Sequence, residues 1–189
     1  MPKLWTLGVI RSSLIMDTFY RLNLANIRGG VRLKALVNYD DQALKRGDFR
    51  PREPFPTKKD EGRNLYEFVG YQDPFNFAIS DMVYQRLAKA ELTGWNSYQI
   101  SIEGKQDEYH GFQVFGKAGE LDRGKETGFV IGFNFDQSTW DGSDFFMPAK
   151  TMLIFCTAKA AQFLVKNKFR NIEVKDIKSV EHYNSPIKT

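Results

Sequence analysis

Two stretches of this chain share a pattern of apolar and polar positions at a constant separation of 77 residues. Residues 77–95, FAISDMVYQRLAKAELTGW, and residues 154–172, IFCTAKAAQFLVKNKFRNI, each begin with a short apolar run and a hydroxyl residue. Apolar residues at helical spacing follow in both stretches, and a second apolar run comes after them. The pattern predicts two strand–helix–strand units, with helices near residues 81–92 and 158–169.

The residues that match between the two stretches fit this interpretation. They are Ser80 with Thr157, Gln85 with Gln162, Leu87 with Leu164, Lys89 with Lys166, and Leu92 with Phe169. Ser80 and Thr157 are residues that cap helix N-termini. Gly94 and Asn171 are of the two types that most readily take the left-handed conformation after a helix. We expect the matched leucines to be buried in a common core.

The remaining chain contains further strand patterns and one long polar stretch. Strand-like patterns occur at residues 17–24, 98–102, 109–115 and 128–135. Residues 40–63 are polar and repeatedly broken by glycine and proline, which predicts a long surface loop. The glycines between residues 116 and 128 are interpreted as turns, because they lack the order of a phosphate-binding loop.

These patterns together predict an α+β fold. We expect a mixed, largely antiparallel sheet with two helices that come from an internally duplicated strand–helix–strand unit. Residues 65–189 would form the duplicated α+β core. Residues 1–64 would be an N-terminal segment of the same domain, with a strand and a long basic loop. Met16 is a possible alternative initiator, and we expect residues 1–15 to contribute little to the core.

The composition of the chain indicates the cellular compartment in which the protein is expected. The chain has 189 residues, of which 42% are apolar, so it can bury a substantial core. Its single cysteine, Cys156, lies in an apolar run and is expected to be a buried thiol in a reducing compartment. No apolar run approaches the ~20 residues that span a bilayer, and the N-terminal residues do not form a secretory signal. The expected location is the cytoplasm, without membrane contact.

Charge is unevenly spread along the chain. The formal net charge is +4, but residues 1–70 carry +5, residues 71–150 carry −5 and residues 151–189 carry +4. Such a distribution suits a protein partner with complementary patches better than a uniform polyphosphate. Residues 45–63 could form a basic nucleic-acid-binding loop, but acidic residues are interleaved with its basic ones. Nucleic-acid binding is therefore not the expected function.

The densest group of polar side chains lies in the acidic loop that begins at Asp136. It contains Asp136, Trp140, Asp141 and Asp144, at a spacing too irregular for a calcium loop. Aspartates in such a loop commonly bond to their own backbone in turns. A tryptophan beside carboxylates also fits an interface anchor, so these four residues are the candidate partner-binding site. We predict no catalytic residue, metal or cofactor.

Several short motifs resemble one bacterial group of proteins. They are the Leu92-Thr-Gly-Trp95 helix end, the strand Tyr109-X-Gly-Phe-X-Val-X-Gly116, Asp141-Gly-Ser-Asp144-Phe145-Phe146, and the last cap–helix–strand unit. Over residues 65–181 the chain resembles immunity proteins of polymorphic toxin systems, related to the myxobacterial immunity domain and formerly a domain of unknown function. The resemblance implies a cytoplasmic α+β protein without catalytic residues, which binds and neutralises a cognate toxin domain.

The leading hypothesis is therefore a non-catalytic binding protein, in particular an immunity protein whose partner is a toxin. The alternative is a small hydrolase-type enzyme that uses His110 with carboxylates of the acidic loop. These two classes predict different sites, since an enzyme needs polar groups that converge in a pocket and a binding protein needs an exposed patch.

Overall fold

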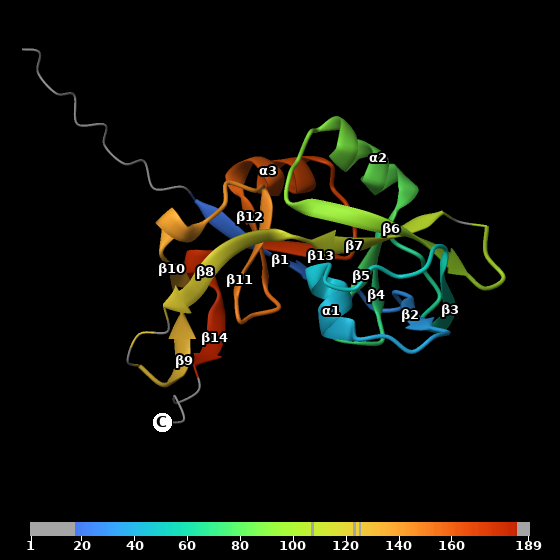
Figure 1. The fold of residues 1–189 in the computed structure, drawn as a ribbon, viewed down its shortest axis with the longest axis horizontal. Helices are drawn as coiled ribbons and strands as arrows, with labels where there is room; N and C mark the ends of the chain where they lie inside the picture. The colour runs from blue at the N-terminus through green and yellow to red at the C-terminus, as the bar shows by residue number, and fades with distance from the viewer. Residues whose placement is uncertain (1–17, 107, 123, 125, 185–189) are drawn as a thin grey trace, which may run out of the picture.

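The computed structural model describes residues 18–106, 108–122, 124 and 126–184, and it has two lobes that lie side by side (Figure 1). The expectation for residues 1–15 lies outside the described residues. The structure is mixed α+β with mostly strands, as predicted, but it has a barrel, an open sheet and a ribbon in place of the single expected sheet, and three α-helices in place of two among the described residues. Within the described ranges, no helix is long and apolar enough to cross a membrane.

The first lobe is a closed barrel of six strands with two helices. The barrel order is β2-β3-β6-β7-β5-β4. Its elements are β2 (Arg32–Ala35), α1 (Asp41–Arg46), β3 (Phe55–Glu61), β4 (Phe68–Tyr71), β5 (Phe77–Ser80), α2 (Asp81–Lys89), β6 (Trp95–Ile102) and β7 (Tyr109–Val114).

The second lobe is an open six-stranded sheet with one α-helix and a separate two-stranded ribbon. The sheet order is β10-β8-β11-β12-β1-β13, and β14 pairs with β9 in the ribbon. The strands are β1 (Phe19–Leu24), β8 (Gly116–Asp122), β9 (Gly128–Ile131), β10 (Asn134–Phe135), β11 (Phe145–Ala149), β12 (Ile154–Thr157), β13 (Ile172–Asp176) and β14 (Glu181–Asn184). The helices are α3 (Ala158–Lys166) and the 3₁₀ turns η1 (Gln137–Thr139) and η2 (Ile177–Ser179).

The two lobes have the same strand order. Read from β3, the barrel runs β3-β2-β4-β5-β7-β6, and the open sheet runs β10-β8-β11-β12-β1-β13. In both, the second and third strands are parallel and the other successive neighbours are antiparallel. The second lobe takes β1, from the start of the chain, where the first lobe uses β7.

The pairing registers agree residue by residue. Phe68 faces Ile79 in the first lobe, and Phe145 faces Cys156 in the second, each residue 77 positions after its counterpart. The middle strands also correspond: β5 and β6 pair with β7 in the registers with which β12 and β13 pair with β1. Tyr109 on β7 thereby matches Phe19 on β1.

The predicted strand–helix–strand units are found at the predicted places. α2 and α3 each follow one strand and precede another, and Leu87 and Leu164 are both buried. Gly94 and Asn171 both have left-handed backbones, with φ of 81° and 66°. The helix caps differ, because the Thr157 hydroxyl accepts a bond from the Ala160 amide whereas the Ser80 side chain makes no cap bond.

The described part of the chain has three hydrophobic clusters. One lies inside the barrel and includes Phe55, Tyr71 and Tyr98. A second lies in the second lobe and is built mainly from phenylalanines. The third and largest takes residues from both lobes, including Leu87 of α2 and Leu164 of α3. The lobes therefore share a continuous core rather than merely touching.

Two reciprocal hydrogen bonds join the lobes across this shared core. The Thr93 amide donates to Oδ2 of Asp144 over 3.0 Å, and the Arg170 amide donates to Oε2 of Glu67 over 3.0 Å. Thr93 and Arg170 hold matching positions, as do Glu67 and Asp144. Burial alone would raise the pKa of Glu67, but the hydrogen bonds from Arg170 outweigh it and lower that pKa. The junction thus has approximate twofold character.

The expectation of a long loop over residues 40–63 is wrong. α1 forms because the Asp40 carboxylate caps the Ala43 amide at 2.8 Å, and Gly47 ends the helix with a left-handed φ of 74°. β3 forms because Phe55 and Thr57 point into the barrel, while the charged residues that follow stay outside. The basic residues therefore belong to a helix and a barrel strand, not to a free loop.

The turn interpretation of the first glycines after β7 is also wrong, because Gly116 and Gly119 lie within β8. A side chain at Gly119 would come within 2.6 Å of the Thr139 hydroxyl oxygen. The Gly119 amide donates to that same oxygen over 2.8 Å. Gly119 therefore allows η1 to lie close against the strand.

Candidate functional site

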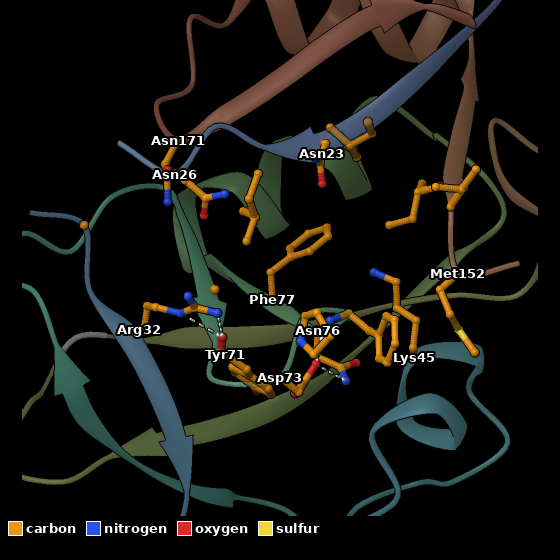
Figure 2. A pocket seen from close by; sticks show the side chains of 18 of the residues that line it. Asn23, Asn26, Arg32, Lys45, Tyr71, Asp73, Asn76, Phe77, Met152 and Asn171 are labelled. Atoms are coloured by element: carbon orange, nitrogen blue, oxygen red, sulfur yellow. Dashed lines mark hydrogen bonds between the residues drawn. The ribbon is translucent and has the colours of Figure 1, made fainter. Parts of the chain in front are cut away.

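A cavity of about 600 Å³ opens between the lobes (Figure 2). It is bounded by α1 and the turn between β4 and β5 on the first lobe. On the second lobe it is bounded by β1 and the connection between β11 and β12. The polar side chains used below are Arg21, Asn23, Arg32, Lys45, Asp73 and Asn76. This volume is within the usual range of ligand-binding pockets.

Lys45 is the most unusual of these residues. It is a charged residue only 1% exposed, and its side chain rises from α1 into the cavity beside Phe77 (Figure 2). The ammonium nitrogen lies 4.5 Å from the centre of the Phe77 ring. Among the described residues, no carboxylate or other acceptor bonds to it. Burial lowers the pKa of Lys45 to about 7, with Asp73 opposing the shift.

Asp73 does not neutralise Lys45 directly because its oxygens are already engaged. Oδ1 accepts bonds from the amides of Phe75 and Asn76, at 2.8 and 2.7 Å. Oδ2 accepts the Tyr39 hydroxyl at 2.5 Å. Burial and this bond raise the pKa of Tyr39, so the hydroxyl stays protonated as the donor. Asp73 thus fixes the turn between β4 and β5.

Two arginines add positive charge to the cavity wall. Arg32 is held by the carbonyl oxygens of Tyr71 and Gln72, at 3.2 and 3.3 Å from Nη2. Arg21 is half-buried, and burial lowers its pKa while Glu173 opposes this. Three cationic side chains and one engaged carboxylate therefore line the cavity. The arrangement favours an anionic group.

The predicted partner-binding loop is placed at the surface of the second lobe, but its residues also make structural contacts. The Trp140 indole N–H donates to the Ser143 carbonyl over 3.0 Å, and its ring packs edge-on against Phe19 at 5.1 Å. Asp141 accepts bonds from the amides of Lys117 and Ser143. These contacts pin the loop, and partner binding by Trp140 and Asp141 stays a prediction.

The other two predicted residues differ sharply in exposure. Asp136 is exposed and accepts bonds from the amide and hydroxyl of Ser138, which lower its pKa. Asp144 is only 8% exposed and accepts bonds from Thr93, Thr157 and Lys159. The carboxylate of Asp144 is directed into the lobe junction. Across the described residues, no three metal-ligating side chains gather into a cluster.

His110, the catalytic candidate of the alternative hypothesis, is not bonded to any of the loop carboxylates. Its Nε2 lies 3.0 Å from Oδ1 of Asp81, and its ring stacks on Tyr84 at 4.4 Å. This places it beside α2 in the first lobe. Cys156 is fully buried, and burial raises the pKa of its thiol to about 12.

A second unusual surface is the ribbon of β9 and β14, which extends from the lower left of the molecule in Figure 1. Its large apolar side chains Phe129, Ile131 and Tyr183 are 75%, 74% and 61% exposed. They lie on one face, because Tyr183 pairs with Phe129 across the strands and Ile131 is two residues further along. The Phe129 and Tyr183 rings are 5.4 Å apart. We call this set the ribbon face.

The motifs that carry the family resemblance meet at one point of the lobe junction. The Gly94 carbonyl accepts the amides of Phe115 and Gly116, at 3.0 and 3.1 Å. A side chain at Gly94 or Gly116 would come within 2.0 or 2.1 Å of the Phe145 carbonyl oxygen. Their glycines are therefore required for close backbone packing. The motifs build the fold, and none of these contacts involves the cavity lysine.

No protein-family model matches this chain, and no curated protein sequence matches it.

Lys45 and the ribbon face were both missed by the sequence reasoning. Lys45 was assigned to a solvated basic loop because the short helix that carries it was not predicted. Phe129 and Ile131 were predicted as part of one strand over residues 128–135, and no strand was predicted at Tyr183. The alternation of large and small residues there could have indicated a two-faced strand, but not that the apolar face is exposed.

Proposed function

We propose that this protein is a non-catalytic binding protein for another protein. The observation that carries the proposal is the exposed ribbon face of Phe129, Ile131 and Tyr183. Contiguous large apolar side chains in water are unfavourable, and in soluble proteins they commonly mark interaction surfaces. Aromatic residues of this kind dominate binding energies at protein interfaces.

The ribbon also suits protein recognition because of its shape. Within the described residues, β9 and β14 form a two-stranded sheet of their own, and the edges of such a ribbon are suited to adding a strand of another protein. Glu181 faces Ile131 across the ribbon and places a carboxylate at one end of the apolar face. An apolar centre with a charged margin is the usual composition of an interface.

We propose further that the partner is a bacterial toxin domain and that the protein acts as its immunity protein in the cytoplasm. This rests on the family resemblance over residues 65–181. The acidic middle third of the chain, which includes β9, would favour a toxin with a basic surface, such as a nuclease. Neutralisation would then be stoichiometric, through occlusion of the toxin.

A binding experiment tests this function. The toxin domain encoded nearest to this gene is titrated with the wild-type protein by calorimetry, and with the triple variant Phe129→Ser, Ile131→Ser, Tyr183→Ser. We expect tight 1:1 binding by the wild type and at least a hundredfold loss in the triple variant, because hot-spot residues carry about 2 kcal/mol or more each. Growth of cells that express the toxin should follow the same order.

The matched control is Val165→Ser, which removes an exposed apolar side chain from α3. It should leave affinity unchanged. Failure of the wild type to bind would contradict the immunity function. Undiminished binding by the triple variant would instead move the interface elsewhere, with Asp136 and Trp140 as the next residues to substitute.

We propose as well that the two lobes descend from one duplicated unit. The shared strand order, the common registers and the 77-residue separation support this origin. Sequences of relatives would test it, because an ancestral repeat predicts relatives in which the two stretches are more alike than here.

A further inference from the structure

The cavity lies at a position in the second lobe whose counterpart in the first lobe is covered by α1. On β7, the Gln113 side chain donates to the carbonyls of Leu44 and Phe49, at 2.7 and 3.2 Å, and so holds α1 and the turn after it. Asn76 also holds α1, because its Nδ2 donates to the Asp41 carbonyl over 2.8 Å. α1 thereby covers one end of the barrel and buries Leu44.

The counterparts of both α1-holding residues line the cavity. The register of β1 and β7 matches Gln113 with Asn23, and the 77-residue separation matches Asn76 with Leu153. Asn23 and Leu153 are both cavity residues, and Asn23 is exposed. Figure 2 shows the Asn23 amide directed into the cavity from β1. In the second lobe, the surface that corresponds to the α1-binding surface of the first lobe is therefore present. Among the described residues, no segment covers it as α1 does in the first lobe.

The positive charge of the cavity favours an occupant that carries a negative charge. An ammonium group that is buried without a partner is unfavourable, whereas one paired with a carboxylate and further hydrogen bonds is not. Among the described residues, Lys45 is paired with no carboxylate, and Arg21 and Arg32 line the same cavity. An occupant with a carboxylate would supply the missing counter-charge.

We propose that the cavity receives a short peptide turn of the partner protein that bears an acidic side chain. The carboxylate would accept bonds from Lys45 Nζ, and a backbone carbonyl of the turn would accept the Asn23 amide, as Leu44 accepts Gln113 in the first lobe. This inference rests on the proposed function, since it takes the partner to be a protein, and it adds a second point of contact to the ribbon face.

A protection experiment tests the cavity without the partner. The protein is acetylated with an N-hydroxysuccinimide ester at pH 7, and the rate at Lys45 is followed by mass spectrometry. The probe is the capped tripeptide acetyl-Ala-Glu-Ala-amide, and its control is acetyl-Ala-Gln-Ala-amide, which has the same shape without the charge. We expect the Glu peptide at millimolar concentration to slow acetylation of Lys45 severalfold and the Gln peptide to have no effect.

Internal and ionic controls decide the alternatives. The rate at Lys89, an exposed lysine on α2, should not change with either peptide. Equal rates at Lys45 with and without the Glu peptide would overturn the proposal. Protection by inorganic phosphate but not by the Glu peptide would also overturn it, in favour of a phosphate site.

The partner experiment separates this inference from the proposed function. Lys45→Met should weaken toxin binding about tenfold or more, as expected for removal of one member of a buried charge pair. Asn23→Leu, a change at an exposed position, should also weaken it and serves if Lys45→Met does not fold. Full affinity in both variants, together with loss in the ribbon variant, would refute the cavity role and leave the function standing.

Discussion

The two lobes share a strand order but end differently. In the first lobe, β3 pairs in parallel with β6 and closes the barrel, and α1 covers one end. In the second, β13 ends at Asp176, η2 turns the chain away, and the sheet stays open. The ribbon face belongs to the second lobe, and the cavity joins Asn23 of that lobe to Lys45 of the first. Both proposed binding features therefore lie where the second lobe departs from the closed framework of the first.

The interiors differ in the same sense. In the barrel, the buried hydroxyls of Tyr71 and Tyr98 bond to each other at 3.0 Å, and burial raises the pKa of both. The interior of the second lobe is formed by phenylalanines, including Phe146 and Phe155, with ring centres 5.9 Å apart. A polar pair inside an apolar core has one favoured arrangement, whereas apolar rings can repack.

The largest effect should come from exchanging the matched residues after the two helices. Gly94→Asn should destabilise the fold by about 3 kcal/mol or more, because its side chain would meet the Phe145 carbonyl. Asn171→Gly should cost about 1 kcal/mol through its lost bonds to Phe68 and Ile27. Denaturant unfolding measures both. Equal costs would show that the junction is more symmetric than its contacts indicate.

The two junction carboxylates should also differ. Asp144→Ala leaves part-buried donors of Thr93 and Thr157 unpaired and should cost about 2 kcal/mol, whereas Glu67→Ala, opposite the exposed Arg170, should cost about 1 kcal/mol. The folded-state pKa of Glu67 is lowered, so its contribution is present above the unfolded pKa and disappears as the pH falls below it. Melting curves at pH 7 and pH 3 should show this, and Glu67→Ala should lose less stability on acidification than the wild type.

Lys45 should give the cavity a signature in the pH dependence of stability. Its pKa is lowered from 10.5 to about 7, so the unfolded chain holds the extra proton between those values. Wild-type stability should therefore rise with pH above 7, by at most about 1.4 kcal/mol per pH unit. Lys45→Met should be more stable than the wild type at pH 6, and the difference should shrink toward pH 10. A parallel pH profile for the two proteins would mean that Lys45 is not buried in solution.

The smallest effect on stability is expected at the ribbon face. Phe129→Ser and Tyr183→Ser remove exposed side chains and should each change the free energy of unfolding by at most about 0.5 kcal/mol. Thermal unfolding measures this. A loss of several kcal/mol would show that the ribbon face packs against the protein itself.

The sequence was informative where local signals and tertiary contacts agree. Ser80, Thr157, Gly94 and Asn171 are local signals, and both helices begin and end near them. α1 was missed because six residues between polar neighbours give no periodicity to detect. β3 was missed because Pro56 within it and Pro54 before it argue against a strand, and its pairing with β2 and β6 makes it one.

The cavity was harder to predict from the sequence than the helices and strands. The cavity joins residues from β1, α1 and the turn before β5, and nothing in the sequence places these segments together. From its residue type, Lys45 was expected to be exposed to solvent, because lysines are almost never fully buried without a partner. Asp136 and Asp141 bond to the backbone of their own loop, as the turn alternative required, whereas Asp144 bonds to Thr93 and Thr157 outside it. Binding by that loop remains a prediction.

The position of β1 has a consequence for how the chain folds during synthesis. The barrel strands lie between residues 32 and 114, so the first lobe is complete on the ribosome before the second lobe has been made. β1 leaves the ribosome earlier still, yet both of its neighbours, β12 and β13, come from the last part of the chain. An apolar edge must therefore wait unpaired through most of translation, exposed to misassembly. Moving residues 18–25 to the end of the chain would remove that wait and should speed refolding without changing the final contacts.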